Sequence, residues 1–391
     1  MRASKKTIIS AALMVTLMLL CIGLLQTIGV SAAESKSGLS EEYQYELYQA
    51  KVLELVNETS YETSEGITTI QTWKVKITNR NYKGREVTVT KTVGDTLVVK
   101  KGDSVVVRLI SEDGGVPEFA LHSHDRTIPL IILCSFFILC VLILGRLKGL
   151  KALISLAITI VLIIFGLIPL LLLGWSPILL SIATCMLSAL LTFAICFGVK
   201  KKSVSAFIGV TGGLIIGGIT AYIFGVLAKI TGFSSGDAQM LQYLPNGNKF
   251  DFKGLLFAGI IISASGACHD VAISIGSALT EIKENQPAIS DKGLIKSGFN
   301  IGKDIMGTMV NTLILAYTGG SLATLLIFIG FGKSFTEIIN LESISTEILR
   351  AITGSLGLLF AIPITILAYV MIEKFIARRK AKREKPKEIE N

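Results

Sequence analysis

A histidine and an aspartate stand side by side in one of the most apolar segments of this chain. They are His269 and Asp270, in the stretch SASGACHDVAISIGSALTEI at residues 263–282. A charge at the centre of a bilayer costs about 2.5–3.5 kcal/mol on insertion scales, and ionisable groups at that depth usually mark ion pathways, proton relays or counter-ions. The stretch therefore makes Asp270 the first candidate for an ion- or proton-binding group.

Polar and small residues recur around Asp270 at helical spacing. Successive members lie three or four positions apart, which places them on one helix face: Ser263, Gly266, Asp270, Ser274, Ser277 and Glu281. The opposite face is apolar: Ile260, Ile261, Val271, Ile275 and Leu279. At about 1.5 Å per residue, Asp270 lies about 16 Å from Glu281, near the bilayer midplane. We therefore expect Asp270 to face other helices.

The next apolar segment repeats this pattern. Asp304, Thr308 and Asn311 stand at positions i, i+4 and i+7, and Asn311 lies about 10 Å further into the membrane than Asp304. Since buried polar groups need partners, Asn311 is the expected partner of Asp270. The predicted substrate or ion site comprises Asp270, Asp304, Asn311, Thr308, Ser274 and Ser263.

Structural alternatives remain open for these residues. Asp270 could be protonated and hydrogen-bonded between helices, and Asp304 could cap the start of its helix. His269 points about 100° away from Asp270 on a regular helix. Whether it or the HSHD stretch at residues 122–125, with His122 and His124, binds a metal stays open, and we assign no metal site.

Several motifs of enzymatic chemistry are missing from the sequence. It contains no phosphate-binding GxxxxGK[ST], no HExxH and no CxxC, and its six cysteines lie in apolar segments. We expect neither enzymatic activity nor a cofactor. An intramembrane hydrolase built on His269 and Asp270 is the weakest of the hypotheses.

The composition indicates a polytopic α-helical membrane protein. Of 391 residues, 51% are hydrophobic and 17% charged, whereas soluble domains average about 25% charged residues. About eight apolar stretches can cross a hydrocarbon core of about 30 Å, or seven if the first is a cleaved signal. They lie at residues 7–30, 129–145, 152–174, 177–199, 204–230, 254–280, 305–330 and 349–375. In the fifth, Gly209, Gly213 and Gly217 predict close helix packing.

The charges predict an orientation in the membrane. The net charge of +9 is concentrated in short loops and in the C-terminal tail, as the positive-inside rule expects of cytoplasmic segments. This distribution explains the basicity without a nucleic-acid partner. We expect a multi-pass protein of the cell membrane, with the tail at residues 377–391 in the cytoplasm.

Residues 34–125 have the composition of a small extracytoplasmic β-rich domain. Runs of β-branched residues separated by turn signals predict about five strands, and we expect an OB-like barrel. The expected strands include residues 68–78, 85–93, 96–103 and 104–110. The predicted domains are thus a signal peptide or anchor at 1–33, the β-domain at 34–125, seven spans within 126–376 and the tail.

Several stretches resemble the YibE/F-like family of prokaryotic integral membrane proteins. They are GACHDVAISIGSALTEI at 266–282, SGFNIGKDIMGTMVNTLILAYTGGSL at 297–322, RAITGSLGLLFAIPIT at 350–365, HDRTIPL at 124–130 and GRLKGLKAL at 145–153. The family's aspartates and asparagine match Asp270, Asp304 and Asn311, whereas His269 departs from its pattern. The resemblance implies a bacterial cytoplasmic membrane and no settled activity.

Two functions of different classes follow. The first is a permease or secondary transporter of an unknown small solute or ion, with Asp270 as the coupling group and Asp304 as a relay. The second is a non-transporting scaffold or sensor, whose outer β-domain binds an envelope ligand or partner protein. In the second case, the polar residues only hold helices together in the lipid bilayer.

Overall fold

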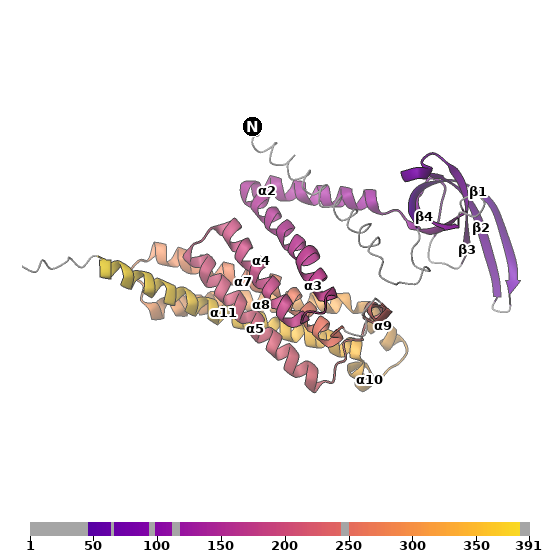
Figure 1. Ribbon diagram of the computed structural model, residues 1–391. Helices are drawn as coiled ribbons and strands as arrows, with labels where there is room; N and C mark the ends of the chain where they lie inside the picture. The colour runs from indigo at the N-terminus through magenta and orange to yellow at the C-terminus, as the bar shows by residue number, and fades with distance from the viewer. Residues whose placement is uncertain (1–45, 64–65, 94–97, 112–117, 244–249, 384–391) are drawn as a thin grey trace, which may run out of the picture. The chain divides into compact units, whose positions relative to one another are not determined.

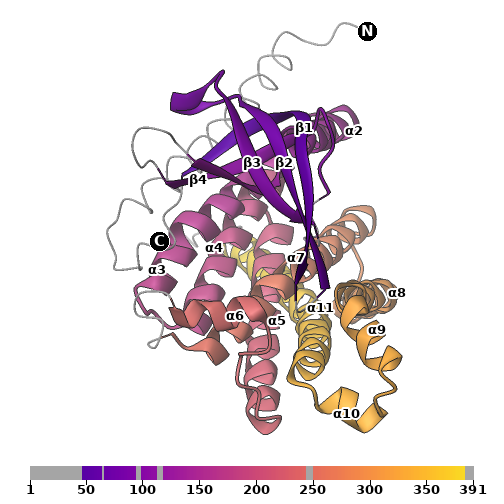
Figure 2. The ribbon, with the colours of Figure 1, turned by 90° about the vertical axis from the view of Figure 1, so that its right-hand side faces the viewer.

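The computed structural model describes residues 46–63, 66–93, 98–111, 118–243 and 250–383. The chain divides into two compact units, Met1–Leu144 and Gly145–Asn391. Figures 1 and 2 show their elements. The expected signal or anchor at residues 1–33 lies outside the described residues. So does the end of the expected tail, from residue 384 onward.

Five strands of the first unit form a closed barrel in the order β1-β2-β3-β5-β4. Their bounds are β1 Leu47–Thr63, β2 Gly66–Ile77, β3 Glu86–Val93, β4 Ser104–Ser111 and β5 Glu118–His124, with the short 3₁₀ helix η2 at Arg80–Tyr82. Only β3 and β5 pair in parallel among these strands. Alternate residues of β2, namely Trp73, Val75 and Ile77, point into the core, as expected for strands with one buried face. The predicted five-stranded barrel is confirmed.

Two segments differ from the prediction. Within the expected strand at residues 96–103, the described residues 98–100 form no strand. The turn signal expected at residues 101–103 is confirmed, and Asp103 Oδ2 accepts a hydrogen bond from the Lys100 amide at 2.8 Å. The first strand, β1, was missed. Its register shifts between Val52 and Glu54 and again between Leu55 and Asn57, and such bulges interrupt the alternation by which strands are recognised.

The rest of the described chain is helical. The elements are α2 Thr127–Val161, the π-helix η4 Leu162–Leu167, α3 Ile168–Leu172, α4 Pro177–Phe197, α5 Lys201–Leu227, α6 Gly236–Met240, the 3₁₀ helix η5 Leu241–Tyr243, α7 Phe252–Asn285, α8 Asp291–Gly320, α9 Leu322–Gly330, α10 Phe335–Asn340 and α11 Glu342–Arg383. Five helical segments in the described residues are long and apolar enough to cross a membrane, or six if the pair α8 and α9, bent by 58°, forms one span. The chain is thus a helical membrane protein.

The expected count of about eight spans stays a prediction, because the described residues show five or six. Two of the expected spans fall in one helical run, Thr127–Leu172, and the first expected span lies outside the described residues. The remaining five match α4, α5, α7, the bent pair of α8 with α9, and α11.

Helices α5 and α11 approach each other most closely at glycines. A Cβ added at Gly213 would lie 2.5 Å from the carbonyl oxygen of Gly357 and 2.9 Å from the Ala361 Cβ. Helix α7 packs against both helices, as Figure 1 shows for this bundle. Nearer the C-terminus of α11, Glu373 pairs with Lys201 at the start of α5, and Lys201 Nζ lies 2.6 Å from Glu373 Oε2. The predicted role of the glycines in helix packing is therefore confirmed.

We predict that Gly213→Ala destabilises the helical unit. The new methyl group has no room, so the helices must separate, at a cost of about 1–3 kcal/mol. The matched control is Gly307→Ala in α8, where an added Cβ meets nothing within 4 Å and alanine favours the helix. Thermal unfolding of the purified protein in detergent should show a lower Tm for Gly213→Ala and an equal or higher Tm for the control. Equal shifts of both variants would contradict the packing argument.

Candidate functional site

Helix α7 has the two faces that the sequence predicts. Ser263, Gly266, Asp270, Ser274 and Glu281 are exposed, and Ser277 is half-buried. The opposite face is buried: Ile260, Ile261, Val271, Ile275 and Leu279. The apolar face packs against α4, α5 and α11. The polar face is the more exposed side of α7, although Ser277 accepts a hydrogen bond from Lys202 Nζ of α5 at 3.4 Å.

Asp270 occupies the middle of this polar face. Helix α7 extends about 27 Å to one side of Asp270 and about 22 Å to the other, at about 1.5 Å per residue. Among the described residues, Asp270 has no hydrogen bond and no ion pair. A carboxylate without a protein partner can accept a proton or bind a cation without first breaking a native contact.

The polar residues of α8 are also exposed. Asp304, Thr308 and Asn311 lie on the exposed side of this helix, and the Thr308 hydroxyl donates to the Ile305 carbonyl oxygen at 2.9 Å. No hydrogen bond joins Asn311 to Asp270 within the described parts of the chain. Their pairing therefore stays a prediction, and the six predicted site residues form no single cluster of hydrogen bonds.

A different contact joins α7 to α8. The Tyr317 hydroxyl donates to Ser263 Oγ at 3.1 Å, so one predicted site residue is held by a partner that the sequence analysis missed. The alternative in which Asp304 caps its helix is wrong. Helix α8 begins at Asp291, where Ser290 Oγ accepts from the Gly293 amide, and Asp304 lies more than three turns inside.

His269 does not lie on the polar face of α7. The ring of His269 makes an edge contact with Phe193 of α4, with centroids 5.5 Å apart, and its buried Nε2 has no hydrogen-bond partner in the described chain.

In the HSHD stretch at the end of the barrel, Asp125 accepts hydrogen bonds from Gln49 Nε2 at 3.0 Å and from the Thr127 amide at 2.9 Å. Asp125 thus joins β1 to the start of α2. The described residues contain no group of three or more His, Cys, Asp or Glu that could hold a metal.

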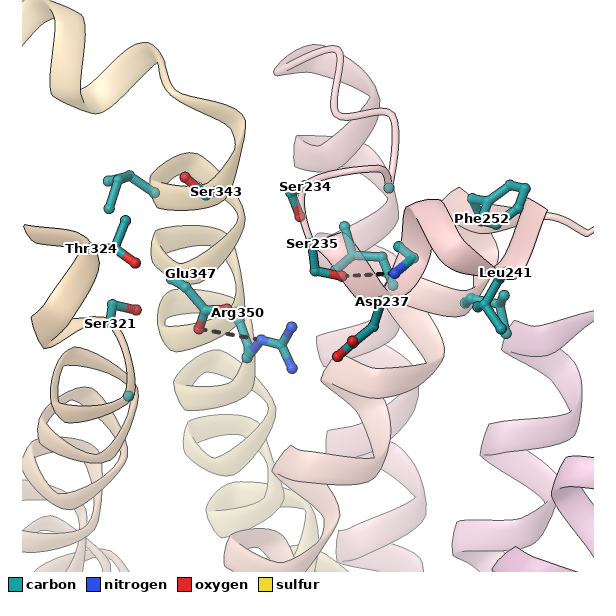
Figure 3. Close-up of a pocket in the computed structure, with 16 residues that line it drawn as sticks. Ser234, Ser235, Asp237, Leu241, Phe252, Ser321, Thr324, Ser343, Glu347 and Arg350 are labelled. Carbon is teal, nitrogen blue, oxygen red and sulfur yellow. Dashed lines mark hydrogen bonds and ion pairs between the residues drawn. The ribbon is translucent and has the colours of Figure 1, made fainter. Parts of the chain in front are cut away.

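A cavity of about 480 Å³ lies at the other end of α7 from Glu281. Its walls come from the loop before α6, from α6, from the start of α7, from the break between α8 and α9, and from the start of α11 (Figure 3). Its charged residues are Asp237, Glu347 and Arg350, and Arg350 Nε lies 3.5 Å from Glu347 Oε2. This cavity was not predicted from the sequence, although the Gly319–Gly320–Ser321 stretch could have indicated the break that forms one wall.

The helical unit thus offers two places for chemistry. The polar face of α7 presents a carboxylate near the middle of the helix, suited to a proton or cation. The cavity presents a guanidinium, two carboxylates and several hydroxyl groups beside apolar side chains, a composition suited to a small polar solute.

Comparison with known proteins bears on these residues. The model of the family described as YibE/F-like protein matches residues 133–374, which include both places. No curated protein and no solved structure matches the chain. Because the match covers more than half of the sequence, the chain belongs to the YibE/F-like family.

Proposed function

We propose that this protein is a permease or secondary transporter of a small solute or ion, with Asp270 as the ion- or proton-coupling group. The observation that carries the proposal is the place of Asp270: halfway along an apolar membrane helix, exposed, and without a partner among the described residues. In this mechanism Ser263, Ser274, Thr308 and Asn311 line the path. Asp304, about 20 Å from the start of α8, acts as a relay.

The polar face of α7 cannot stably contact lipid. An ionised carboxylate facing hydrocarbon is costly, so such residues face a bundle interior or a water-filled cavity. The apolar face of α7 already supplies the packing within the bundle, which leaves the polar face free to line a path for water and ions. A path of this kind gives Asp270 the access to solvent that reversible protonation requires.

The bend between α8 and α9 supports the same function. The two helices meet at an angle of 58° at Ser321, and Ser321 also lines the cavity. Discontinuous membrane helices commonly form solute and ion sites in secondary transporters, because the break frees backbone groups to bind. The bend thus lies where a transported solute could be bound.

We further propose eight spans in the cell membrane, with the β-barrel outside and the tail in the cytoplasm. The run Thr127–Leu172 has 46 residues and extends about 69 Å as helix, more than twice the hydrocarbon thickness. Arg146 interrupts it with a φ of 47°, so we assign two spans to this run. The positive-inside distribution of the loops supports the orientation.

One observation favours the second function, a scaffold or sensor. Strands β1 and β2 stay paired as far as Thr63 and Gly66, and Figure 2 shows them as a long two-stranded hairpin. Leu55 and Val56 on β1 are 42% and 54% exposed. Exposed apolar residues of this kind could contact an envelope protein partner.

We predict that water reaches the polar face of α7 but not its opposite face. In a background whose six native cysteines are replaced by alanine, Ser274→Cys should react with a membrane-impermeant maleimide in native vesicles. The neighbouring Ile275→Cys should react far more slowly, because Ile275 is fully buried. Equal and slow labelling of both cysteines would exclude a water-filled path along this face.

We predict that Asp270→Asn abolishes coupled flux while the protein stays folded. The substitution removes the ionisable group but breaks no contact to a described residue, so Tm should change by no more than a few degrees. The measurement is pH-jump-driven proton or cation flux in proteoliposomes, for which the wild type should exceed the variant by about 10-fold or more.

The control for this experiment is Asp291→Asn at the start of α8. It removes a carboxylate that pairs with Lys374 of α11. It should retain flux close to that of the wild type. Equal flux in the wild type and Asp270→Asn, or none in either, would reject the coupling role. Deletion of residues 34–117 tests the second function, since a scaffold should lose its activity on deletion and keep it in Asp270→Asn.

A further inference from the structure

The cavity near the start of α11 has a fixed rim. Glu342 Oε1 accepts hydrogen bonds from the amides of Thr231 and Gly232, at 2.8 and 2.9 Å, and also from the Thr231 hydroxyl. These bonds tie the loop after α5 to the first turn of α11. Gly232 itself lines the cavity, so the rim is held in place by a charged side chain that does not line it.

Arg350 supplies the positive charge of the cavity. Its side chain is 25% exposed, and only Nε lies near Glu347. Beyond Nε, the guanidinium carries four more N–H donors on its two terminal nitrogens, and Figure 3 shows this group directed into the cavity. Arg350 can therefore bind a carboxylate through two parallel hydrogen bonds.

Asp237 supplies a carboxylate on the other side. It lies in the first turn of α6, whose N-terminus is capped by Ser235 Oγ through the Ala238 amide at 3.1 Å. Among the described residues, no hydrogen bond or ion pair involves the Asp237 carboxylate. In Figure 3 this carboxylate and the Arg350 guanidinium point toward each other across the cavity. Asp237 is thus available to a positively charged group between α6 and α11.

The charges of the cavity select among solutes. Two carboxylates and one guanidinium line it, so a simple anion would be repelled by the excess negative charge. A simple amine would leave the donors of Arg350 without an acceptor. A molecule with both a carboxylate and an ammonium group satisfies Arg350 and Asp237 together.

The remaining walls fit the rest of such a molecule. Phe252, Leu255 and Leu256 of α7 and Ile344 of α11 form an apolar wall, and Ser321, Thr324 and Ser343 add hydroxyl groups. Pockets that bind small molecules combine apolar walls with a few convergent polar groups, in volumes of about 300–1,000 Å³. The volume of about 480 Å³ suits a solute the size of an amino acid.

We propose that this cavity binds a free amino acid or a similarly small zwitterion, with its carboxylate on Arg350 and its ammonium group on Asp237. As the identity of the transported solute, this inference rests on the proposed permease function. As a binding site, it stands on the cavity alone, because binding requires neither flux nor Asp270.

The test measures binding to the purified full-length chain in detergent by thermal shift and titration calorimetry. The probes are the common L-amino acids, together with propionate and ethylamine, which lack the ammonium group and the carboxylate of alanine. At least one amino acid should raise Tm saturably, and neither propionate nor ethylamine should do so at the same concentration. Asp237→Asn and Arg350→Gln should each weaken binding roughly 10- to 100-fold, as expected for hydrogen bonds to charged groups.

The control variants separate this inference from others. Arg378→Gln, at the far, exposed end of α11, should bind as the wild type does. Asp237→Asn removes no hydrogen bond or ion pair with a described residue, so its loss of affinity cannot be assigned to misfolding even if Arg350→Gln unfolds. If an amino acid still binds to Asp270→Asn and no variant shows flux, the transport function would be rejected and the binding site in the cavity would be supported. Absence of binding by every amino acid, binding of propionate as tight as that of alanine, or unchanged affinity in Asp237→Asn would overturn the inference.

Discussion

The close contact between α5 and α11 is the interaction on which the helical unit depends. At Gly213 and Gly357 there is no side chain between the two backbones, and membrane helices associate largely through packing of this kind, since lipid is as apolar as leucine. Because α11 is held along α5, α7 can pack on both helices and α8 on α7 and α11. The contact therefore sets the positions of both α7 faces and of Arg350 in α11.

The packing also explains which groups are left unpaired. Helix α7 uses its aliphatic face against α4, α5 and α11, so its polar face, with Asp270 and Ser274, cannot contribute to that core. Elsewhere in the bundle, some polar side chains are paired: Ser155 donates to Thr192 at 2.6 Å, and the hydroxyls of Thr159 and Ser188 lie 2.7 Å apart. Other polar atoms, such as Ser203 Oγ and His269 Nε2, are buried without a hydrogen-bond partner in the described chain. Asp270 differs from both groups, because it is a carboxylate on an exposed face of an apolar helix.

Periodicity predicted the two-faced character of α7 because that helix is regular over 34 residues. The same approach predicted strands β2, β3 and β4 but neither β1 nor β5, whose pairings contain register shifts that break the alternation. The cavity could not be predicted from sequence. Its residues come from stretches around positions 232–256, 320–324 and 343–350, which only the tertiary packing brings together. Arg350 in particular reads as an ordinary charge at the end of a span until Asp237 is seen opposite it.

The two proposed sites share one rigid element, and this limits how they could be coupled. Leu256 in the cavity wall and Asp270 are both on α7, about 21 Å apart along its axis. A solute and an ion separated by that distance do not interact directly in a screened environment. Coupling would therefore require a movement that changes access to both sites. The junction of α8 and α9 is suited to this movement, because Gly319 and Gly320 have no atom within 4 Å of an added Cβ and Ser321 beside them contacts the cavity. A shift of α9 about this junction would alter the cavity wall without disturbing the contact between α5 and α11.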